Sequence, residues 1–274
     1  MNNLTYRFPL MVTFDVDAET MWTARDPKYA NWPIMMSQGA YSWKIGVWRV
    51  LDVLRRYGIK TTFFVPGLVV EQHQEMIDGI LKDGHEIAHH SHTHRWIVSL
   101  TPEEEAEEME KGIEAIVKAT GRAPRGWRSP AAEITDYTKE LMLKHEFSYS
   151  SNFFDDERPY MLPINGKPSD IVELPFRYAL SDSPYFQFSK ALPGRSISAP
   201  SAVLEIWKWD FDVLYAEQRM MVLALHPEFS GQPFASKLLD QFLAYAMSHS
   251  YVRADPCEVI AEDYRRSLKE EVAS

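Results

Sequence analysis

The sequence predicts an α/β fold in which a mostly parallel sheet is covered by helices. Segments with the composition of strands alternate along the chain with segments of helical spacing, and such alternation is typical of parallel sheets. About seven of these units fit into the 274 residues, which favours a barrel of fewer than eight strands over two separate domains. Neither an internal repeat nor a low-complexity linker interrupts the alternation, so we expect a single domain over residues 1–274.

The first half of the chain opens with PLMVTFDVD (9–17), which is β-branched and aromatic and ends in acids, as a buried strand does. Residues 18–40 contain two tryptophans and two prolines without a clear period, so they predict a long loop. The helix that begins at Thr101 has the strongest start signal, because TPEE supplies an N-cap, a proline at the first helical position and acids in the first turn. Helices are predicted over 45–57, 68–83 and 101–121, and strands over 61–65 and 86–90.

The second half continues the alternation around a central segment of different composition. Residues 155–200 are rich in Pro, Ser and Asp and contain one clear strand, IVELPF (171–176). The other strands are predicted over 126–130, 147–153 and 220–226, and the helices over 135–145, 201–218 and 233–249. The acidic run over 103–111 is expected to be the solvated face of its helix, without a ligand role.

Charge and composition exclude several classes of function. The formal net charge is −10 and the pI about 5.4, so the protein has no field that would attract nucleic acid or an anionic membrane. The first residues lack a basic region and a cleavage site, and no apolar run approaches the roughly 18 residues of a membrane span, so we expect a cytoplasmic protein. Cys257 is the single cysteine, so a metal site would have to use His and carboxylate side chains.

Five of the nine histidines lie in HEIAHHSHTH (85–94), which is either a solvated loop or part of a metal site. His90 and His94 would be roughly 13 Å apart in an extended strand but only about 5 to 6 Å apart in one helical turn. We therefore expect the chain to turn helical just after His90. Two imidazoles and a carboxylate then form an open site for a divalent metal, which lowers the pKa of a water to roughly 7.

The polar residues that follow predicted strands are expected to meet at one mouth, because function gathers where parallel strands end. They are Asp15, Asp17, His90, His94, Arg128 and His226.

Four short motifs occur in a fixed order: TFDVD (13–17), HSHTH (90–94), RSP (128–130) and LALH (223–226). Together they resemble the polysaccharide deacetylase family, also called carbohydrate esterase family 4 or the NodB-like hydrolases. The resemblance implies a distorted (β/α)7 barrel and metal-dependent removal of acyl groups from amide nitrogen. It also implies that Asp15 is the general base, Arg128 its partner, Asp17, His90 and His94 the metal ligands, and His226 the general acid.

Two departures from the family pattern bear on the substrate. Val16 separates the two aspartates that are adjacent in the usual motif, and Ala18-Glu19 replaces a glycine. This FDVDAE form resembles a branch with cytoplasmic deacetylase-like proteins, allantoinases and cyclic imide hydrolases, whose members assemble as tetramers, so we expect a homo-oligomer. A further motif of the family, an acidic stretch that contains tryptophan, is weak in this sequence. Asp182 is the best candidate for the acid that interacts with His226 and tunes its chemistry.

The leading hypothesis is a metal-dependent hydrolase of non-peptide carbon–nitrogen bonds that removes acetyl groups from N-acetylated sugars, with zinc as the default ion for this ligand set. The alternative is a ring-opening amidohydrolase that acts on a cyclic imide or ureide. A non-haem iron oxygenase would suit the same ligands but not the added base, acid and arginine, and a binding module would not need them. A small molecule or an oligosaccharide is the expected partner, with Trp22, Trp32 and Trp43 as a sugar platform, a lid or core.

Overall fold

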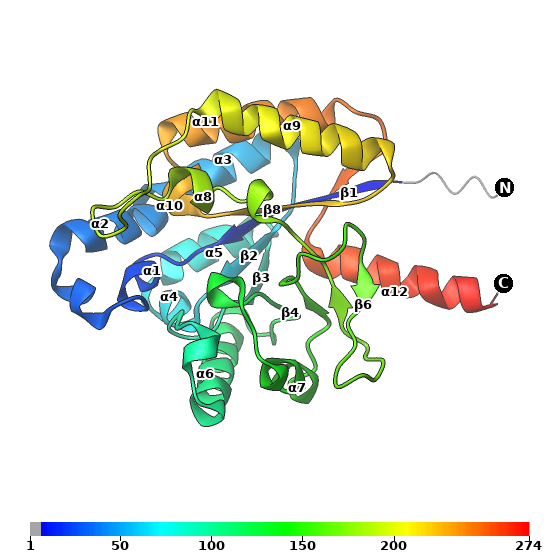
Figure 1. Ribbon diagram of the computed structural model, residues 1–274, viewed down its shortest axis with the longest axis horizontal. Helices are drawn as coiled ribbons and strands as arrows, with labels where there is room; N and C mark the ends of the chain where they lie inside the picture. Colours follow the sequence, from blue (N-terminus) through cyan, green and yellow to red (C-terminus); the bar gives the residue numbers. More distant parts are fainter. Residues whose placement is uncertain (1–6, 274) are drawn as a thin grey trace.

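The computed structural model describes residues 7–273 and is built around one curled sheet (Figure 1). Its strands are β1 (Phe8–Asp15), β2 (Thr62–Val65), β3 (Glu86–His89), β4 (Gly126–Trp127), β5 (Tyr149–Ser150), β6 (Tyr160–Met161), β7 (Val172–Glu173), β8 (Met221–Leu225) and β9 (Val252–Ala254). Their order is β6-β7-β5-β4-β3-β2-β1-β8, with β9 paired to β1. All pairs between these strands are parallel except β6 with β7. The predicted α/β class is therefore confirmed, as a barrel whose edges, β6 and β8, do not close on each other.

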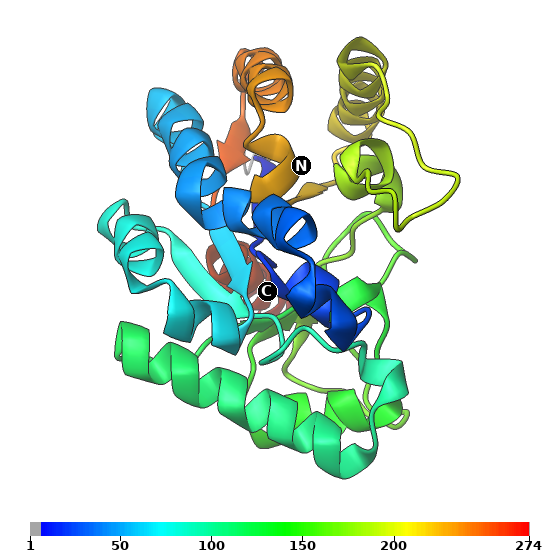
Figure 2. The same ribbon diagram turned by 90° about the vertical axis from the view of Figure 1, so that its left-hand side faces the viewer.

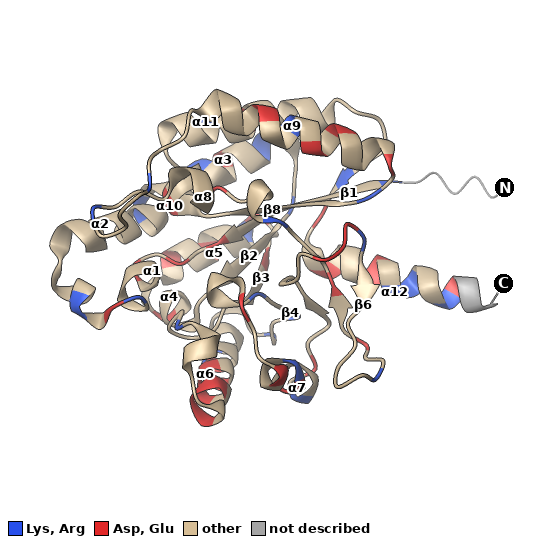
Figure 3. Ribbon diagram, viewed as in Figure 1, with Lys and Arg blue, Asp and Glu red and all other residues tan. Residues whose placement is uncertain are grey.

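Helices surround this sheet on the outside, as the view onto one end of the molecule shows (Figure 2). They are α1 (Thr20–Thr23), α2 (Pro33–Tyr41), α3 (Val47–Tyr57), α4 (Gly67–Gln72), α5 (Gln74–Lys82), α6 (Pro102–Thr120), α7 (Asp136–Lys144), α8 (Ser183–Phe186), α9 (Pro200–Ala216), α10 (Pro227–Ser230), α11 (Pro233–Met247) and α12 (Cys257–Ala273). Acidic residues gather on α6, and the strands contain few charged residues (Figure 3). Within residues 7–273, no helix is long and apolar enough to cross a membrane.

The two faces of the sheet differ because side chains alternate along each strand. In β1, Leu10, Val12 and Phe14 point outward and pack in the main core beneath the helices, whereas Met11 belongs to a smaller core inside the curl. Burial of each such side chain contributes about 1.5 to 3 kcal/mol to the free energy of folding. The same alternation puts Asp15 on the inner face, two residues beyond Thr13, so the interior changes from apolar to polar toward the carboxyl ends of the strands.

The opposite end of the barrel is closed by α12. Cys257, Ile260 and Ala261 are buried in the inner core, next to Tyr149. At the start of this helix, the backbone N–H of Glu258 donates to the buried Glu86 carboxyl at 3.2 Å. The predicted elements end with a helix at residue 249 and include neither β9 nor α12; α12 begins directly after Pro256, without a clear helical start signal.

Three other predictions about local structure were wrong. Residues 18–40 are mostly helical instead of a loop, because their prolines, Pro27 and Pro33, stand at the first positions of helical turns, where proline is well tolerated. The predicted helix over 68–83 is broken at His73, which has a non-helical backbone (φ −131°, ψ 53°) and separates α4 from α5. In addition, several strands are shorter than expected, β4 most clearly.

Candidate active site

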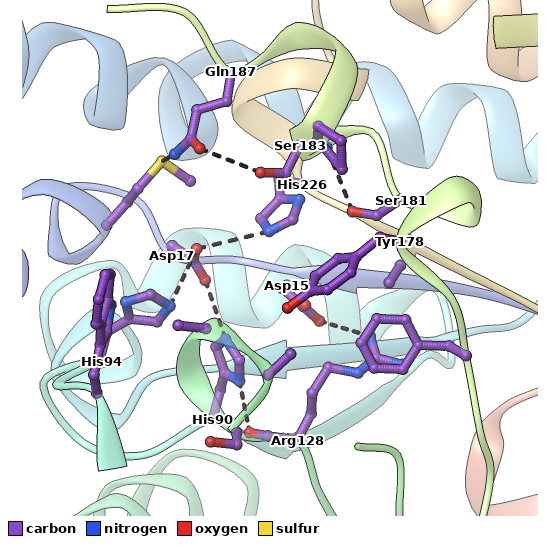
Figure 4. A pocket seen from close by; sticks show the side chains of 18 of the residues that line it. Asp15, Asp17, His90, His94, Arg128, Tyr178, Ser181, Ser183, Gln187 and His226 are labelled. Atoms are coloured by element: carbon purple, nitrogen blue, oxygen red, sulfur yellow. Dashed lines mark hydrogen bonds and ion pairs between the residues drawn. The ribbon is translucent and has the colours of Figure 1, made fainter. Parts of the chain in front are cut away.

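All six side chains expected at the mouth line one cavity of about 530 Å³ at the carboxyl ends of the strands. They come from β1 and the residues after it, from the segments that follow β3, β4 and β8, and they point toward one another (Figure 4). The six residues are Asp15, Asp17, His90, His94, Arg128 and His226.

Asp17, His90 and His94 form a compact, buried group that can hold a metal ion. The Nε2 atom of His90 lies 3.3 Å from Oδ1 of Asp17, and Nε2 of His94 lies 3.2 Å from Oδ2. One donor atom of each residue falls within 4.8 Å of the other two. Burial works to raise the pKa of Asp17, but the two imidazoles outweigh it and hold the pKa well below its ordinary value, so the carboxylate is charged.

The protonation of His90 fits a cation better than a hydrogen bond to Asp17. Its Nδ1 lies 2.7 Å from the Arg128 carbonyl oxygen, which can only accept, so Nδ1 carries the proton and donates. In the neutral ring, Nε2 then presents a lone pair to the Asp17 Oδ1 atom, which is buried and makes no hydrogen bond. Two electron-rich atoms that face each other in a buried position are satisfied by a metal ion between them.

The loop that carries both histidines folds differently from the prediction. Instead of a helical turn after His90, the chain reverses through two residues with positive φ, Ser91 (66°) and His94 (62°). This left-handed backbone brings the imidazole ring centroids to 5.0 Å without any helix. The predicted proximity of the two rings therefore holds, but its predicted cause is wrong.

Glu108 on α6 holds this loop in place. Its Oε2 atom accepts hydrogen bonds from Ser91 Oγ (2.6 Å), His92 N (3.0 Å) and Thr93 N (2.7 Å), and Oε1 accepts from Thr93 Oγ1 at 2.5 Å. Burial raises the pKa of Glu108, but the hydrogen bonds from Ser91 and Thr93 outweigh it and lower the pKa. Glu108 therefore stays ionised beneath the loop.

The expectation that the acidic run over 103–111 is only a solvated face is thus wrong for two of its members. Glu105 and Glu108 are buried, on the side of α6 that faces the barrel. Glu105 accepts a hydrogen bond from the Thr135 hydroxyl at 2.9 Å and another from Thr138. Helical spacing was the available signal, since positions three residues apart, such as 105 and 108, share one face of a helix. The uniform charge of the run concealed that this face is buried.

Asp15 is paired with Arg128 inside the barrel. Nη1 of Arg128 lies 2.8 Å from Asp15 Oδ1 and 2.7 Å from Thr13 Oγ1, and the guanidinium is 1% exposed. The cation packs over the rings of Phe64 and Phe176, 4.1 and 4.9 Å from their centroids. Such aromatic faces and the paired carboxylate together stabilise a buried charge. Arg128 therefore fixes the position of the Asp15 carboxylate.

His226 lies on the side of Asp17 opposite His90 and His94, with its Nε2 atom 3.9 Å from Asp17 Oδ2 (Figure 4). Asp182, the candidate for tuning it, is fully buried and lies with Oδ1 2.7 Å from His226 Nδ1. The other oxygen of Asp182 accepts from the His226 backbone N–H at 2.9 Å and from the Ser230 hydroxyl at 2.5 Å. Burial lowers the pKa of His226, but the Asp182 carboxylate outweighs it and raises the pKa to about 10.

The three tryptophans of the N-terminal segment do not line this cavity. Trp22 is buried in the main core, Trp43 stacks on His73, and Trp32 contacts Tyr29. The Trp43 indole N–H also donates to Glu19 at 2.9 Å, so this part of the segment is internally packed.

Two other aromatic residues stand at the mouth, and neither was expected there from the sequence. Trp96 and Tyr178 line the cavity and are 41% and 55% exposed. Trp96 lies only two residues beyond His94, which was the available signal, whereas Tyr178 is distant in sequence from every motif.

Comparison with known proteins agrees with this geometry. Residues 40–150 match the model of the family described as "Polysaccharide deacetylase". A putative polysaccharide deacetylase from Mycobacterium smegmatis superposes with a TM-score of 0.92 at 32% identity, over 98% of this chain and 94% of that one. The chain belongs to the polysaccharide deacetylase family. The resemblance inferred from the four motifs is confirmed.

Other polysaccharide deacetylase relatives span nearly the whole chain. The "Peptidoglycan deacetylase" of Helicobacter pylori is 28% identical over an alignment of 275 positions, which covers 91% of this chain and 94% of its own. PuuE allantoinase superposes with a TM-score of 0.78, over 97% of this chain and 92% of its own, at 24% identity. At that identity the likeness to PuuE allantoinase shows that the two share a fold.

Proposed function

We propose that this member of the polysaccharide deacetylase family is a metal-dependent hydrolase that removes acetyl groups from the amide nitrogen of N-acetylated sugars. The observation that carries the proposal is the convergence, in one cavity, of a His/His/Asp group, a carboxylate paired with arginine and a carboxylate-bound imidazole. Each of these parts has a separate task in amide hydrolysis. A bare binding site would require none of them.

Asp17, His90 and His94 are the proposed metal ligands, and zinc is the proposed ion, since two imidazoles and one carboxylate with open positions suit it. When bound, a divalent ion polarises the amide carbonyl and makes hydroxide available near neutral pH. Metal analysis of the purified protein, with titration of the metal-free form by Zn²⁺, Co²⁺ and Mg²⁺, tests the choice of ion.

The chain's own residues move the protons. Asp15, held by Arg128 as its carboxylate, takes a proton from the attacking water. His226, protonated and oriented by Asp182, gives a proton to the nitrogen that leaves as the tetrahedral intermediate collapses. The high pKa of His226 keeps this imidazole protonated, as a general acid must be before it acts.

A backbone amide is available to stabilise the developing oxyanion. In the turn after β4, Ser129 N donates to Asn152 and Ala132 N donates to the Ser129 carbonyl, while Pro130 has no N–H. Among the described hydrogen bonds the amide of Ala131 has no acceptor, and Ala131 lines the cavity. We assign its N–H to the oxyanion.

The names of the relatives and the character of the mouth support an N-acetylated sugar as substrate. Several of the relatives are named peptidoglycan deacetylases. The exposed rings of Trp96 and Tyr178 supply flat apolar surfaces of the kind on which sugar rings stack. A small cytoplasmic substrate, a homo-oligomeric assembly and a single domain over the whole chain stay predictions. Cell fractionation, light scattering and limited proteolysis test them in turn.

The deciding experiment offers the metal-loaded protein a mixture of N-acetylglucosamine oligomers, allantoin and simple cyclic imides, with products identified by mass spectrometry. The proposal expects sugars that have lost acetyl groups, with acetate released in equal amount. Addition of one water to a ring compound, with intact acetyl groups on the sugars, would replace the proposal by ring-opening hydrolysis. A variant in which Asp15 is replaced by Asn serves as the inactive control.

A further inference from the structure

Two arginines, Arg25 and Arg195, stand at the mouth of the active-site cavity and are not used by the proposed reaction. Both are exposed, and neither belongs to any ion pair within residues 7–273. Asp26, the acid that follows Arg25 in the sequence, forms an ion pair with Lys28 instead. A chain with a net charge of −10 thus keeps two positive groups at the entrance to its site that form no ion pair within the described residues.

Arg195 is held on the His226 side of the mouth by neutral partners. Its Nη1 atom donates to Gln187 Oε1 at 2.7 Å and to the Ser183 carbonyl oxygen at 3.3 Å. Gln187 is itself buried and fixed by contacts with Ser183 and Met21, and Figure 4 shows it above His226 with Ser183. These hydrogen bonds orient the guanidinium but leave its charge uncompensated.

Arg25 is held on the His94 side of the mouth. Its guanidinium lies over the ring of Trp96, 5.7 Å from the ring centroid, and Trp96 follows His94 by two residues. The contact restrains the side chain without neutralising it. Arg25 and Arg195 therefore approach the mouth from two different loops, one beside Trp96 and the other beside Gln187.

The positive charges of the two guanidinium groups also repel each other. Partial desolvation of the guanidinium at the rim of the cavity and the charge of Arg195 both lower the pKa of Arg25, and the charge of Asp17 partly offsets them. Like charges held this way repel, and an oxyanion between them would remove the repulsion while it gained charge-assisted hydrogen bonds.

We infer that Arg25 and Arg195 form a clamp for an anionic group, carboxylate or phosphate, carried by the substrate next to its N-acetylated sugar. The inference rests on the proposed function, since it places the acetamide at Asp17 and His226 and the anion at the mouth. It narrows the substrate class to acidic N-acetyl sugars. A neutral chitin-like oligomer would leave both guanidiniums unpaired.

The test compares three substrates that share the acetamide: N-acetylglucosamine, its 6-phosphate, and N-acetylmuramic acid, which carries a carboxylate. kcat/KM is measured for each with the metal-loaded protein and with the variants Arg25→Gln and Arg195→Gln. Arg266→Gln, an exposed arginine on α12 outside the cavity, is the matched control. We expect at least one anionic sugar to exceed the neutral one by about tenfold, and each clamp variant to lose most of that advantage while neutral turnover changes little.

Preference for the phosphate or for the carboxylate identifies the source of the anion. Rising ionic strength should reduce the advantage, since exposed charges are screened. Equal kcat/KM for neutral and anionic sugars, or an advantage that survives in both clamp variants, would overturn the clamp and leave the deacetylase proposal standing.

A binding measurement separates the two failures. If none of the three sugars loses its acetyl group, the proposed function fails, and the clamp is then judged by calorimetric titration of the metal-free protein with the same sugars. Tighter binding of an anionic sugar that disappears in Arg25→Gln supports the clamp. Equal binding of all three sugars refutes it.

Discussion

The imidazole of His226 is fixed by Asp182. One carboxylate oxygen of Asp182 lies 2.7 Å from Nδ1 of His226, and the other accepts a hydrogen bond from the backbone N–H of His226 at 2.9 Å. One side chain thus sets both the ring orientation and the position of the strand end that carries it. The arrangement leaves Nε2 directed at Asp17.

Replacement of Asp182 by Asn should impair proton donation more than binding. The amide cannot hold the imidazolium charge, so the pKa of His226 falls and the protonated ring is lost at lower pH. We expect kcat to fall by about a hundredfold with a small change in KM, and the alkaline limb of the kcat profile to move to lower pH. Ser230→Ala, which removes one hydrogen bond to the same carboxylate, should cost far less, and an unshifted alkaline limb in Asp182→Asn would contradict the assignment.

Replacement of His94 by Ala should abolish stoichiometric metal binding. The imidazole supplies one of three proposed donor atoms, and the two that remain, on Asp17 and His90, do not enclose an ion. Metal content per chain, measured by atomic emission after dialysis, should fall from about one to near zero. His145→Gln, at the end of α7 and outside the cavity, should retain the metal. Full metal occupancy in His94→Ala would show that the ligand set is wrong.

Glu108 offers a test of the loop that leaves all three proposed metal-binding residues in place. Glu108→Gln keeps the shape but replaces an acceptor by a donor among four hydrogen bonds. We expect the metal affinity to drop by about 10- to 100-fold, the usual effect of disturbing the residues that orient metal ligands. Glu107→Gln, on the solvent side of the same helix and paired with Lys111, should bind metal normally. Equal affinities in the two variants would mean that the loop does not need Glu108.

Glu86 predicts how stability depends on pH. Burial and the charge of Glu258 raise its pKa from about 4.5 to about 7. Because the folded state holds the proton more tightly, the contribution of Glu86 to stability is complete below pH 4.5 and is lost as pH rises through 7. At about 1.4 kcal/mol per pKa unit, the loss is roughly 3 kcal/mol. Glu86→Gln, which resembles the protonated acid, should therefore gain stability relative to the parent between pH 4.5 and 8 in denaturant unfolding, and a constant difference would refute the assignment.

Much of the fold was predictable because its strands are buried on both faces and read as apolar runs. The alternation of strands and helices predicted the parallel sheet, and Thr101 is the N-cap of α6 as its sequence predicted, with Glu104 completing a capping box. The helices over 20–41 escaped prediction because their apolar residues follow no single face. The C-terminal helix α12 escaped because its buried residues, such as Ile260, contact strands far away in the sequence.

The candidate site was predictable where a residue type reveals its chemistry at a strand end, as for Asp15 and His90. Contacts across the barrel gave no comparable signal. In the sequence, Glu108 looks like any other acid of a charged helix. Its role depends on a loop in which Ser91 and His94 have positive φ, and the sequence gives no sign of this because residues other than glycine rarely adopt that conformation. Arg25 and Arg195 are likewise 170 residues apart in sequence, and only the folded chain places both at one mouth.

The position of α12 has a practical consequence for handling the protein. This helix closes the end of the barrel that lies away from the cavity, and its described residues extend to Ala273 on the side of Figure 1 opposite α1 and α2. An affinity tag, a fluorophore or a link to a solid support attached behind this helix would leave the mouth facing the solution. Immobilised in that orientation, the protein would stay accessible even to long polymeric substrates.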